Sequence, residues 1–161
     1  MTTAESVVRV FVEEMWGTGN IDLVDAVVDE HYRPDGQAGG RDFVRRNMRR
    51  FRAGFPDHAV RIIHLVASGD QVAVLFEHTG THLGVFGGME PTGRKMRFLE
   101  SGFFTVRDGK VVSADWVSDG LGLRIQLGYL PEDFWRNPHR DGPLMPQAGS
   151  PASRKTRKGW R

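Results

Sequence analysis

Residues 95–128 read KMRFLESGFFTVRDGKVVSADWVSDGLGLRIQLG, and this stretch decides the fold. Apolar and polar residues alternate through its first twelve residues and again through 110–118, which is the period of a half-buried strand. The turn at Asp108-Gly109 joins the two stretches, so we predict an antiparallel hairpin. The Gly-Leu pairs that come after the second strand predict a short helix over 121–127.

Upstream of this hairpin the chain first has a helical period and then two more strand-like stretches, at 60–66 and 71–81. The predicted helices lie at 4–16, 20–29 and 42–54, with a turn-rich segment at 32–40. Five arginines on the third helix are expected to form a solvated face. Helices followed by a run of antiparallel strands predict an α+β fold, in which a curved, mostly antiparallel sheet wraps around the N-terminal helices.

Composition limits the class of protein. A chain of 161 residues with 39% hydrophobic residues is long enough for one domain with its own core. It contains no cysteine, which excludes disulfides, thiolate nucleophiles and thiolate metal ligands. No apolar run approaches the roughly 20 residues that span a bilayer. We therefore expect a soluble, cytoplasmic protein without a membrane partner.

The positive charge of the chain is concentrated at its C-terminus. The net charge is +2, but the last eight residues hold five of the Lys and Arg residues, so residues 1–153 carry about −3. Pro, Gly, Ser and Gln dominate from residue 139 onward, which indicates a flexible extension. We expect a cone-forming domain over 1–138 and a basic tail over 139–161. No aromatic-interleaved basic face accompanies the tail, so nucleic acid is not the expected partner.

Two carboxylates near the end of the last predicted strand suggest acid–base chemistry. Asp115 and Asp119 are four residues apart, and an even spacing places both on one face of a strand. Paired carboxylates in a pocket can remove and return protons. The chemistry depends on whether this face is turned to a pocket or to water.

The order of several short motifs resembles the SnoaL-like polyketide cyclases, over about residues 4–131. These motifs are Phe55-Pro56-Asp57, Thr79-Gly80-Thr81-His82, Gly84, Phe86-Gly87, Pro91-Thr92-Gly93, Asp108-Gly109-Lys110-Val111-Val112, Asp119, Gly122-Leu123 and Gln126-Leu127-Gly128. The resemblance implies the cone-shaped fold named after nuclear transport factor two, with a deep apolar pocket. It also implies intramolecular aldol ring closure of a polyketide-type substrate, without metal or organic cofactor, in a homodimer or higher homo-oligomer.

The resemblance makes Asp119 the expected catalytic acid–base group, because it precedes Gly-Leu where the similar cyclases keep a carboxylate. Asp119 is equally suited to cap the short helix that follows it. Asp115 stands where these cyclases usually carry Trp, and Trp116 comes one residue later. Either Asp115 enters the pocket and pairs with Asp119, or a bulge restores the usual facing and Trp116 lines the cavity.

Two histidines are candidates for the pocket. The resemblance places His82 toward the substrate, where it would bind a carbonyl, although a structural hydrogen bond is the alternative. His78 shares a strand face with Val74 and Phe76 and is the second candidate. The six histidines of the chain form no persuasive set of metal ligands, and we expect no metal.

Further substrate-binding candidates come from the apolar stripes. Glu100 is in phase with Phe98 and Phe104, and a carboxyl group in such a stripe is costly unless it is paired or faces a cavity. Met48 and Phe51, on the third predicted helix, are expected in the core or the pocket wall. Asp35 lies in a turn-rich segment, where relatives often carry histidine, and either a surface turn or the substrate site accounts for it.

Three functions are consistent with the sequence. The first is a SnoaL-like cyclase acting on a hydrophobic polyketide-type or polycyclic substrate. The second is an epoxide hydrolase, isomerase or dehydratase on the same fold that uses Asp115 and Asp119 together. The third is a ligand-binding module without catalysis, which a shallow or collapsed pocket would favour.

Overall fold

A computed structural model describes residues 3–134 of the chain and contains one curved sheet of five strands, in the order β1-β5-β4-β3-β2. The strands are β1 (Val28–Pro34), β2 (Ala59–Ser68), β3 (Gln71–Thr81), β4 (Lys95–Arg107) and β5 (Lys110–Ser118). Strand β1 runs parallel to β5, and every other neighbouring pair is antiparallel. The sheet is open, because β1 and β2 are its two edges. The predicted α+β class and all four predicted strands are confirmed.

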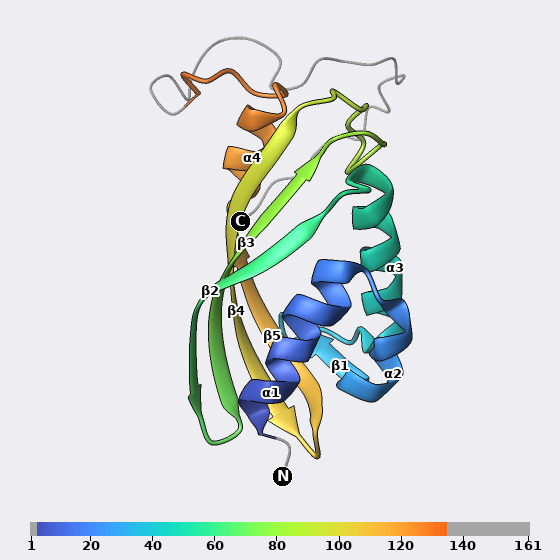
Figure 1. The fold of residues 1–161 in the computed structure, drawn as a ribbon, viewed down its shortest axis with the longest axis vertical. Coiled ribbons are helices and arrows are strands. Elements are labelled where there is room, and N and C mark those ends of the chain that lie inside the picture. The colour runs from blue at the N-terminus through green and yellow to red at the C-terminus, as the bar shows by residue number, and fades with distance from the viewer. Residues whose placement is uncertain (1–2, 135–161) are drawn as a thin grey trace, which may run out of the picture.

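The helices pack mainly on one side of this sheet (Figure 1). They are α1 (Ala4–Arg9), which continues as the π-helical η1 (Val10–Trp16), then the 3₁₀ turn η2 (Ile21–Leu23), α2 (Val24–Val27), α3 (Gly40–Gly54) and α4 (Gly120–Gln126). A reciprocal cap between Thr3 and Ser6 begins α1. The short helix α4 packs against β4 at the upper end of the sheet (Figure 1).

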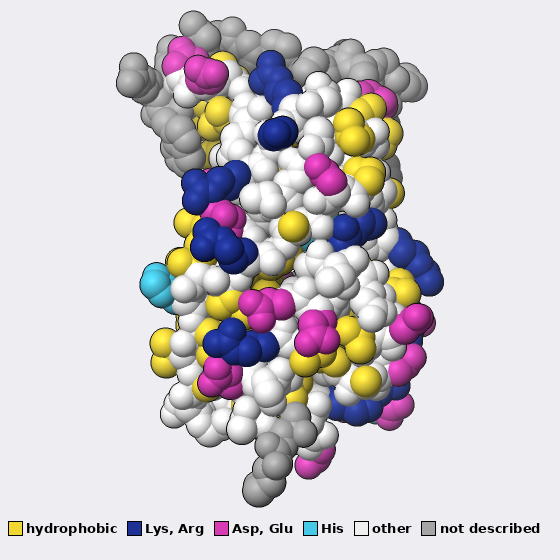
Figure 2. All heavy atoms as spheres, viewed as in Figure 1, with side chains coloured by type: hydrophobic (Ala, Val, Ile, Leu, Met, Phe, Trp, Pro, Cys, Tyr) yellow, Lys and Arg dark blue, Asp and Glu magenta, His cyan; other side chains and the backbone are white. Residues whose placement is uncertain are grey.

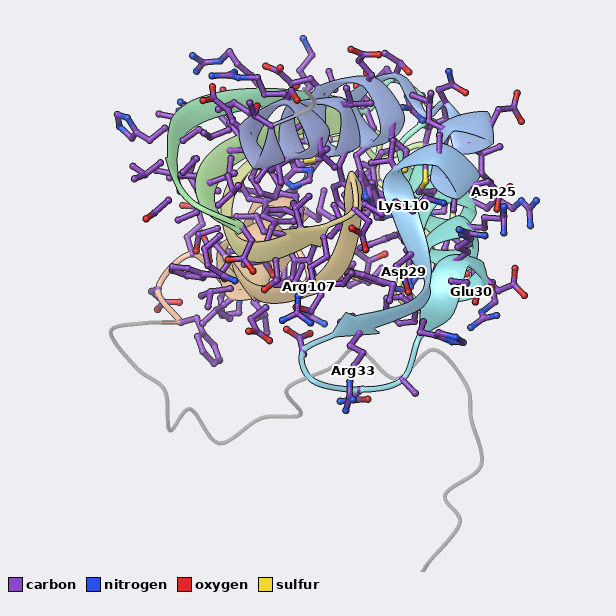
Figure 3. The ribbon with its side chains drawn as sticks, turned by 90° about the horizontal axis from the view of Figure 1, so that it is seen from below. Asp25, Asp29, Glu30, Arg33, Arg107 and Lys110 are labelled. Carbon is purple, nitrogen blue, oxygen red and sulfur yellow. The ribbon has the colours of Figure 1, made fainter. Side chains whose placement is uncertain are left out.

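The segment after α2 differs from the prediction. The helix expected over 20–29 is reduced to η2 and α2, and the chain then enters β1, which the sequence did not predict. Strand β1 is short and carries several charged residues. Only Val28, Tyr32 and Pro34 are buried along it. This segment is a strand because it pairs with β5. Lys110 Nζ donates to the backbone oxygen of Asp25 at 2.9 Å and so links the start of β5 to α2 (Figure 3).

The arginines of α3 do not all form a solvated face, so that expectation was partly wrong. Arg52 donates to the backbone oxygens of His58 at 2.9 Å and Gly17 at 3.2 Å, and thereby joins the end of α3 to η1. Arg45 is paired with Asp25 at 2.6 Å. The other three of the five predicted arginines, Arg46, Arg49 and Arg50, are exposed.

Two apolar clusters stabilise the domain. The larger lies between α1, η1 and the sheet, and its fully buried side chains include Phe11, Tyr32 and Phe104. The smaller lies under α4 and the loop between β3 and β4, around Phe55 and Phe98. The space between the two clusters is where a cavity remains.

The face seen in Figure 2 carries interspersed basic and acidic side chains, without a large patch of one sign. No helix within residues 3–134 is long and apolar enough to cross a membrane. The basic tail predicted over 139–161 lies outside the described residues, as does the end of the domain predicted over 1–138.

Candidate functional site

A cavity of about 330 Å³ lies between the two apolar clusters, within the range of small-molecule sites. The helical side of its wall comes from η1, α3 and α4, and the sheet side from β1, β3, β4 and β5. Its polar lining side chains are Tyr32, Asn47, His78, Glu100, Ser118 and the two arginines Arg50 and Arg124. Most of the other lining residues are aromatic or aliphatic, so the cavity is mostly apolar.

Among the cavity-lining residues within 3–134, Glu100 is the only one with a carboxyl group. It lies on β4 opposite Phe76, with 21% of its side chain exposed. Burial raises the pKa of Glu100 from its ordinary value of 4.5 to about 7, and repulsion by the charge of Asp35 adds to the effect. A carboxyl group with such a pKa exchanges protons readily at neutral pH.

His78 stands beside this carboxyl group. Its Nε2 lies 3.8 Å from Oε2 of Glu100 and has no hydrogen-bond partner among the described residues. Its Nδ1 is 2.8 Å from Nε2 of His58, and its ring stacks on Phe98 with centroids 4.5 Å apart. Burial lowers the pKa of His78 to about 3 and that of His58 to about 4, so both rings are neutral at pH 7. His78 therefore presents an uncharged nitrogen to the cavity.

Tyr32 and Trp116 form a second polar pair in the wall. Trp116 donates from Nε1 to the hydroxyl oxygen of Tyr32 at 3.3 Å, which leaves the phenolic O–H free to donate. Burial raises the pKa of Tyr32, so the phenol keeps its proton. Gly102 makes room for the indole, because a Cβ there would lie 2.8 Å from the ring of Trp116.

A bulge in β5 decides which residue faces the cavity. Thr105 pairs with Ser113 but Val106 pairs with Val111, so Val112 is the extra residue on β5. After the bulge Trp116 faces the cavity and Asp115 is exposed on the outer face. Of the two alternatives, the structure has the one with the bulge, in which Trp116 lies in the cavity wall and Asp115 does not. Any catalytic role of Asp115 stays a prediction.

Asp119 also lies outside the cavity wall. It is exposed, and its Oδ1 accepts the N–H of Gly122 at 2.7 Å as the N-cap of α4. Its neighbours Ser118 and Gly120 line the cavity, whereas Asp119 itself does not. The structure thus does not bring Asp119 and Asp115 together in a pocket, and the catalytic role of Asp119 stays a prediction.

His82 is buried in the smaller apolar cluster and not in the cavity wall. Its ring stacks on Phe55 at 5.2 Å, and its Nδ1 lies 3.2 Å from Oγ1 of Thr92. Its backbone N–H and C=O bond to Arg94 and Gly93, which closes the loop between β3 and β4. This geometry supports the structural alternative, and His78 occupies the position in the pocket.

The remaining candidates divide between wall and core. Phe51 and Phe98 line the cavity. Phe104 is fully buried behind the wall, with its ring edge-on to Trp116 at 4.9 Å, and Met48 is buried in the larger cluster. Neither of these two lines the cavity, and Met48 takes the core position that was one of its two expected places. Substrate contact of either residue stays a prediction.

Asp35 acts on the site from outside the wall. It is exposed at a positive φ of 48°, and its Oδ1 accepts the backbone N–H of Trp116 at 2.9 Å. The surface-turn alternative is correct for its position. Its charge nevertheless contributes to the raised pKa of Glu100.

Sequence reasoning missed six polar groups of the site, namely Tyr32, Asn47, Arg50, His58, Ser118 and Arg124. Tyr32 lay in a segment read as a turn, and Asn47 and Arg50 lay on a helix face read as solvated. Within residues 3–134, no group of three or more His, Asp or Glu side chains is arranged to hold a metal ion.

The comparisons with known proteins agree with this architecture. Residues 6–127 match the model of the SnoaL-like polyketide cyclase family. The chain belongs to this family. The resemblance predicted from the sequence motifs is thereby confirmed, while no curated protein matches the sequence.

Solved structures resemble this SnoaL-like protein over most of its length. A protein of Jannaschia sp. CCS1, provisionally named a SnoaL-like polyketide cyclase, is 25% identical with a TM-score of 0.71, covering 80% of this chain and 93% of that one. TsrD of Streptomyces laurentii is 24% identical with a TM-score of 0.72, covering 78% and 95%. AclR of Streptomyces galilaeus, provisionally named a hydroxylase, is 23% identical with a TM-score of 0.71, covering 80% and 83%. The last two share the fold and establish no common reaction.

Proposed function

We propose that this SnoaL-like protein is an acid–base enzyme on a polyketide-type intermediate, in which Glu100 removes and returns a proton. The observation that carries the proposal is the position of Glu100. Within the described part of the chain it is the one carboxylate that lines this apolar cavity, with a pKa of about 7, and Nε2 of His78, which has no hydrogen-bond partner there, lies 3.8 Å away.

The proposed reaction begins at a carbon next to a carbonyl group. Ionised Glu100 takes the proton from this carbon, and the electron pair moves onto the carbonyl oxygen as an enolate. The O–H of Tyr32 is a donor for this oxygen, since its own oxygen already accepts from Trp116. Neutral His78, in the tautomer that carries the proton on Nε2, is a second donor.

In ring closure, the enolate carbon attacks a second carbonyl of the same substrate. The new carbon–carbon bond turns that carbonyl oxygen into an alkoxide, which takes the proton back from Glu100. The apolar walls hold the substrate folded, so that the two carbons meet within one molecule. The complete aldol cycle needs only one carboxyl group, because Glu100 is ionised again at the end of the cycle.

An isomerase is the second candidate, because Glu100 and the O–H of Tyr32 are also the groups needed to move a proton between two carbons of an enone. The two-carboxylate enzymes predicted from Asp115 and Asp119 receive no support, since neither side chain lines the cavity. A non-catalytic module is not favoured either, because the pocket has not collapsed.

The proposed first step is measurable without knowledge of the natural substrate. 2-Tetralone is an apolar bicyclic ketone, and deuterium uptake at its α carbons in D₂O is followed by mass spectrometry. We expect wild-type protein to accelerate this exchange, with a rate that rises through a pKa of about 7 and is level above it, because Glu100 must be ionised. Exchange at the rate of buffer alone would contradict the proposal.

We also propose that the protein forms a homo-oligomer through the outer face of the sheet. Leu99, Phe103 and Val117 lie on this face and are 44%, 58% and 68% exposed. Exposed apolar surface of this kind is typical of protein interfaces.

Sedimentation of the wild-type protein should therefore give at least a dimer at micromolar concentration. Phe103→Glu should shift the protein toward the monomer. A wild-type monomer would contradict this part.

A further inference from the structure

Two arginines belong to the wall of the cavity, from helices that are distant in sequence. Arg50 lies on α3 and Arg124 on α4, and both side chains are exposed while lining the same cavity. An apolar cavity that holds two guanidinium groups at its solvent-exposed side offers an apolar ligand a place for negative charge.

Neither arginine is neutralised by a carboxylate among the described residues. Arg124 donates to the backbone oxygen of Gly120 at 3.0 Å, and the guanidinium of Arg50 lies 5.9 Å from the ring centre of Phe86. Arg45, on the same helix as Arg50, is by contrast paired with Asp25 at 2.6 Å. Both cavity arginines therefore keep donors for a ligand.

The two arginines differ from Glu100 in their exposure to solvent. A guanidinium in contact with Glu100 would stabilise its ionised form and lower its pKa. The pKa of Glu100 is instead raised, by burial and by the negative charge of Asp35. Glu100, with 21% of its side chain exposed, lies next to His78, whereas the side chains of both arginines are exposed.

We propose that the substrate carries an oxyanion, a carboxylate or a phosphate ester, at one end of an apolar ring system, and that Arg50 and Arg124 bind this group at the cavity mouth. The inference rests on the proposed acid–base function, since it places the reacting carbonyls of the same substrate beside Glu100. Arginine forks bind both kinds of oxyanion through paired N–H donors.

The test compares three probes that share one ring system, 2-naphthoate, its methyl ester and 2-naphthyl phosphate, by titration calorimetry. Wild-type protein should bind naphthoate about five- to tenfold more tightly than the ester, as expected for charge-assisted contacts at a partly exposed site. Raising the salt concentration should reduce this preference. Tighter binding of the phosphate than of naphthoate assigns the group to a phosphate ester, and the reverse order assigns it to a carboxylate.

Variants of the two arginines test whether these side chains cause the preference for the anionic ligand. Arg50→Gln and Arg124→Gln should each lower the affinity for naphthoate, and the double variant should bind naphthoate and ester equally. Arg46→Gln is the matched control, because Arg46 is exposed on α3 outside the cavity wall. Unchanged affinity for the ester shows that each variant is folded. A wild-type protein without preference for the anions, or a preference that survives in the double variant, would overturn the proposal.

The outcome is separable from that of the proposed reaction. Glu100→Gln should keep the preference for naphthoate over the ester, because the oxyanion site does not include this carboxyl group. Loss of proton exchange with an intact anion preference therefore leaves this inference standing. An active protein without anion preference contradicts the inference alone.

Discussion

Replacing Glu100 with glutamine should slow deuterium exchange of 2-tetralone by about 10²- to 10⁴-fold, which is the usual contribution of a positioned general base. Glutamine has nearly the same shape and cannot accept the proton. The cavity, the Tyr32 donor and the His58–His78 pair remain in place, so the affinity for methyl 2-naphthoate should stay within about twofold. The measurement is the initial exchange rate at pH 8, where Glu100 of the wild type is ionised.

Asp119→Asn is the decisive companion variant, because the family motif points to this residue and the geometry points to Glu100. Asparagine keeps the Oδ1 acceptor that caps α4, so the helix should remain folded. We expect exchange within about threefold of wild type, since the Asp119 side chain is exposed and solvent screens its charge. A normal rate in Glu100→Gln together with a lost rate in Asp119→Asn would reverse the assignment.

Glu100→Gln should also be more stable than wild type above pH 7, by up to about 3 kcal/mol at the usual 1.36 kcal/mol per pKa unit. Between the unfolded pKa of 4.5 and the folded pKa of about 7, the folded state of the wild type binds more protons at Glu100 than the unfolded state. Its unfolding free energy therefore falls as the pH rises through this window. Glutamine has no such titration.

The stability difference should accordingly be close to zero at pH 4 and reach its maximum near pH 8, as measured by urea unfolding of both proteins. His58 and His78 have lowered pKa values and destabilise the fold as the pH falls below 6.5, but they are common to both proteins and cancel in the difference. A difference that does not depend on pH would mean that Glu100 has an ordinary pKa in the folded protein.

The strands and the long helices were predictable because their apolar periods extend over many residues. Strand β1 was not, since it is short, carries Asp29, Glu30 and Arg33, and is a strand because it pairs with β5. Arg33 of this strand points away from the fold (Figure 3), and the buried residues Val28, Tyr32 and Pro34 do not form the regular alternation that indicates a strand. Tertiary pairing overrode the local signal there.

The site was predictable only in part, because strand register decides which side chains meet. Glu100 and His78 lie in the cavity wall, on the face that their strand phase indicated, but their proximity depends on the pairing of His78 with Phe98 on β4. His58 reaches His78 from a loop, which no period reveals. The family motif favoured Asp119 as the catalytic residue, but an aspartate directly before a helix is also a preferred N-cap.

Titration of the Glu100 carboxyl carbon by ¹³C NMR measures the pKa on which the proposed acid–base role of Glu100 depends. The signal is assigned as the one missing from Glu100→Gln in protein labelled at glutamate. We predict a midpoint near pKa 7 in the wild type, and a lower pKa in Asp35→Asn, which keeps the hydrogen bond to Trp116 and removes the charge. A midpoint near 4.5 would contradict the assignment of Glu100 as the acid–base group.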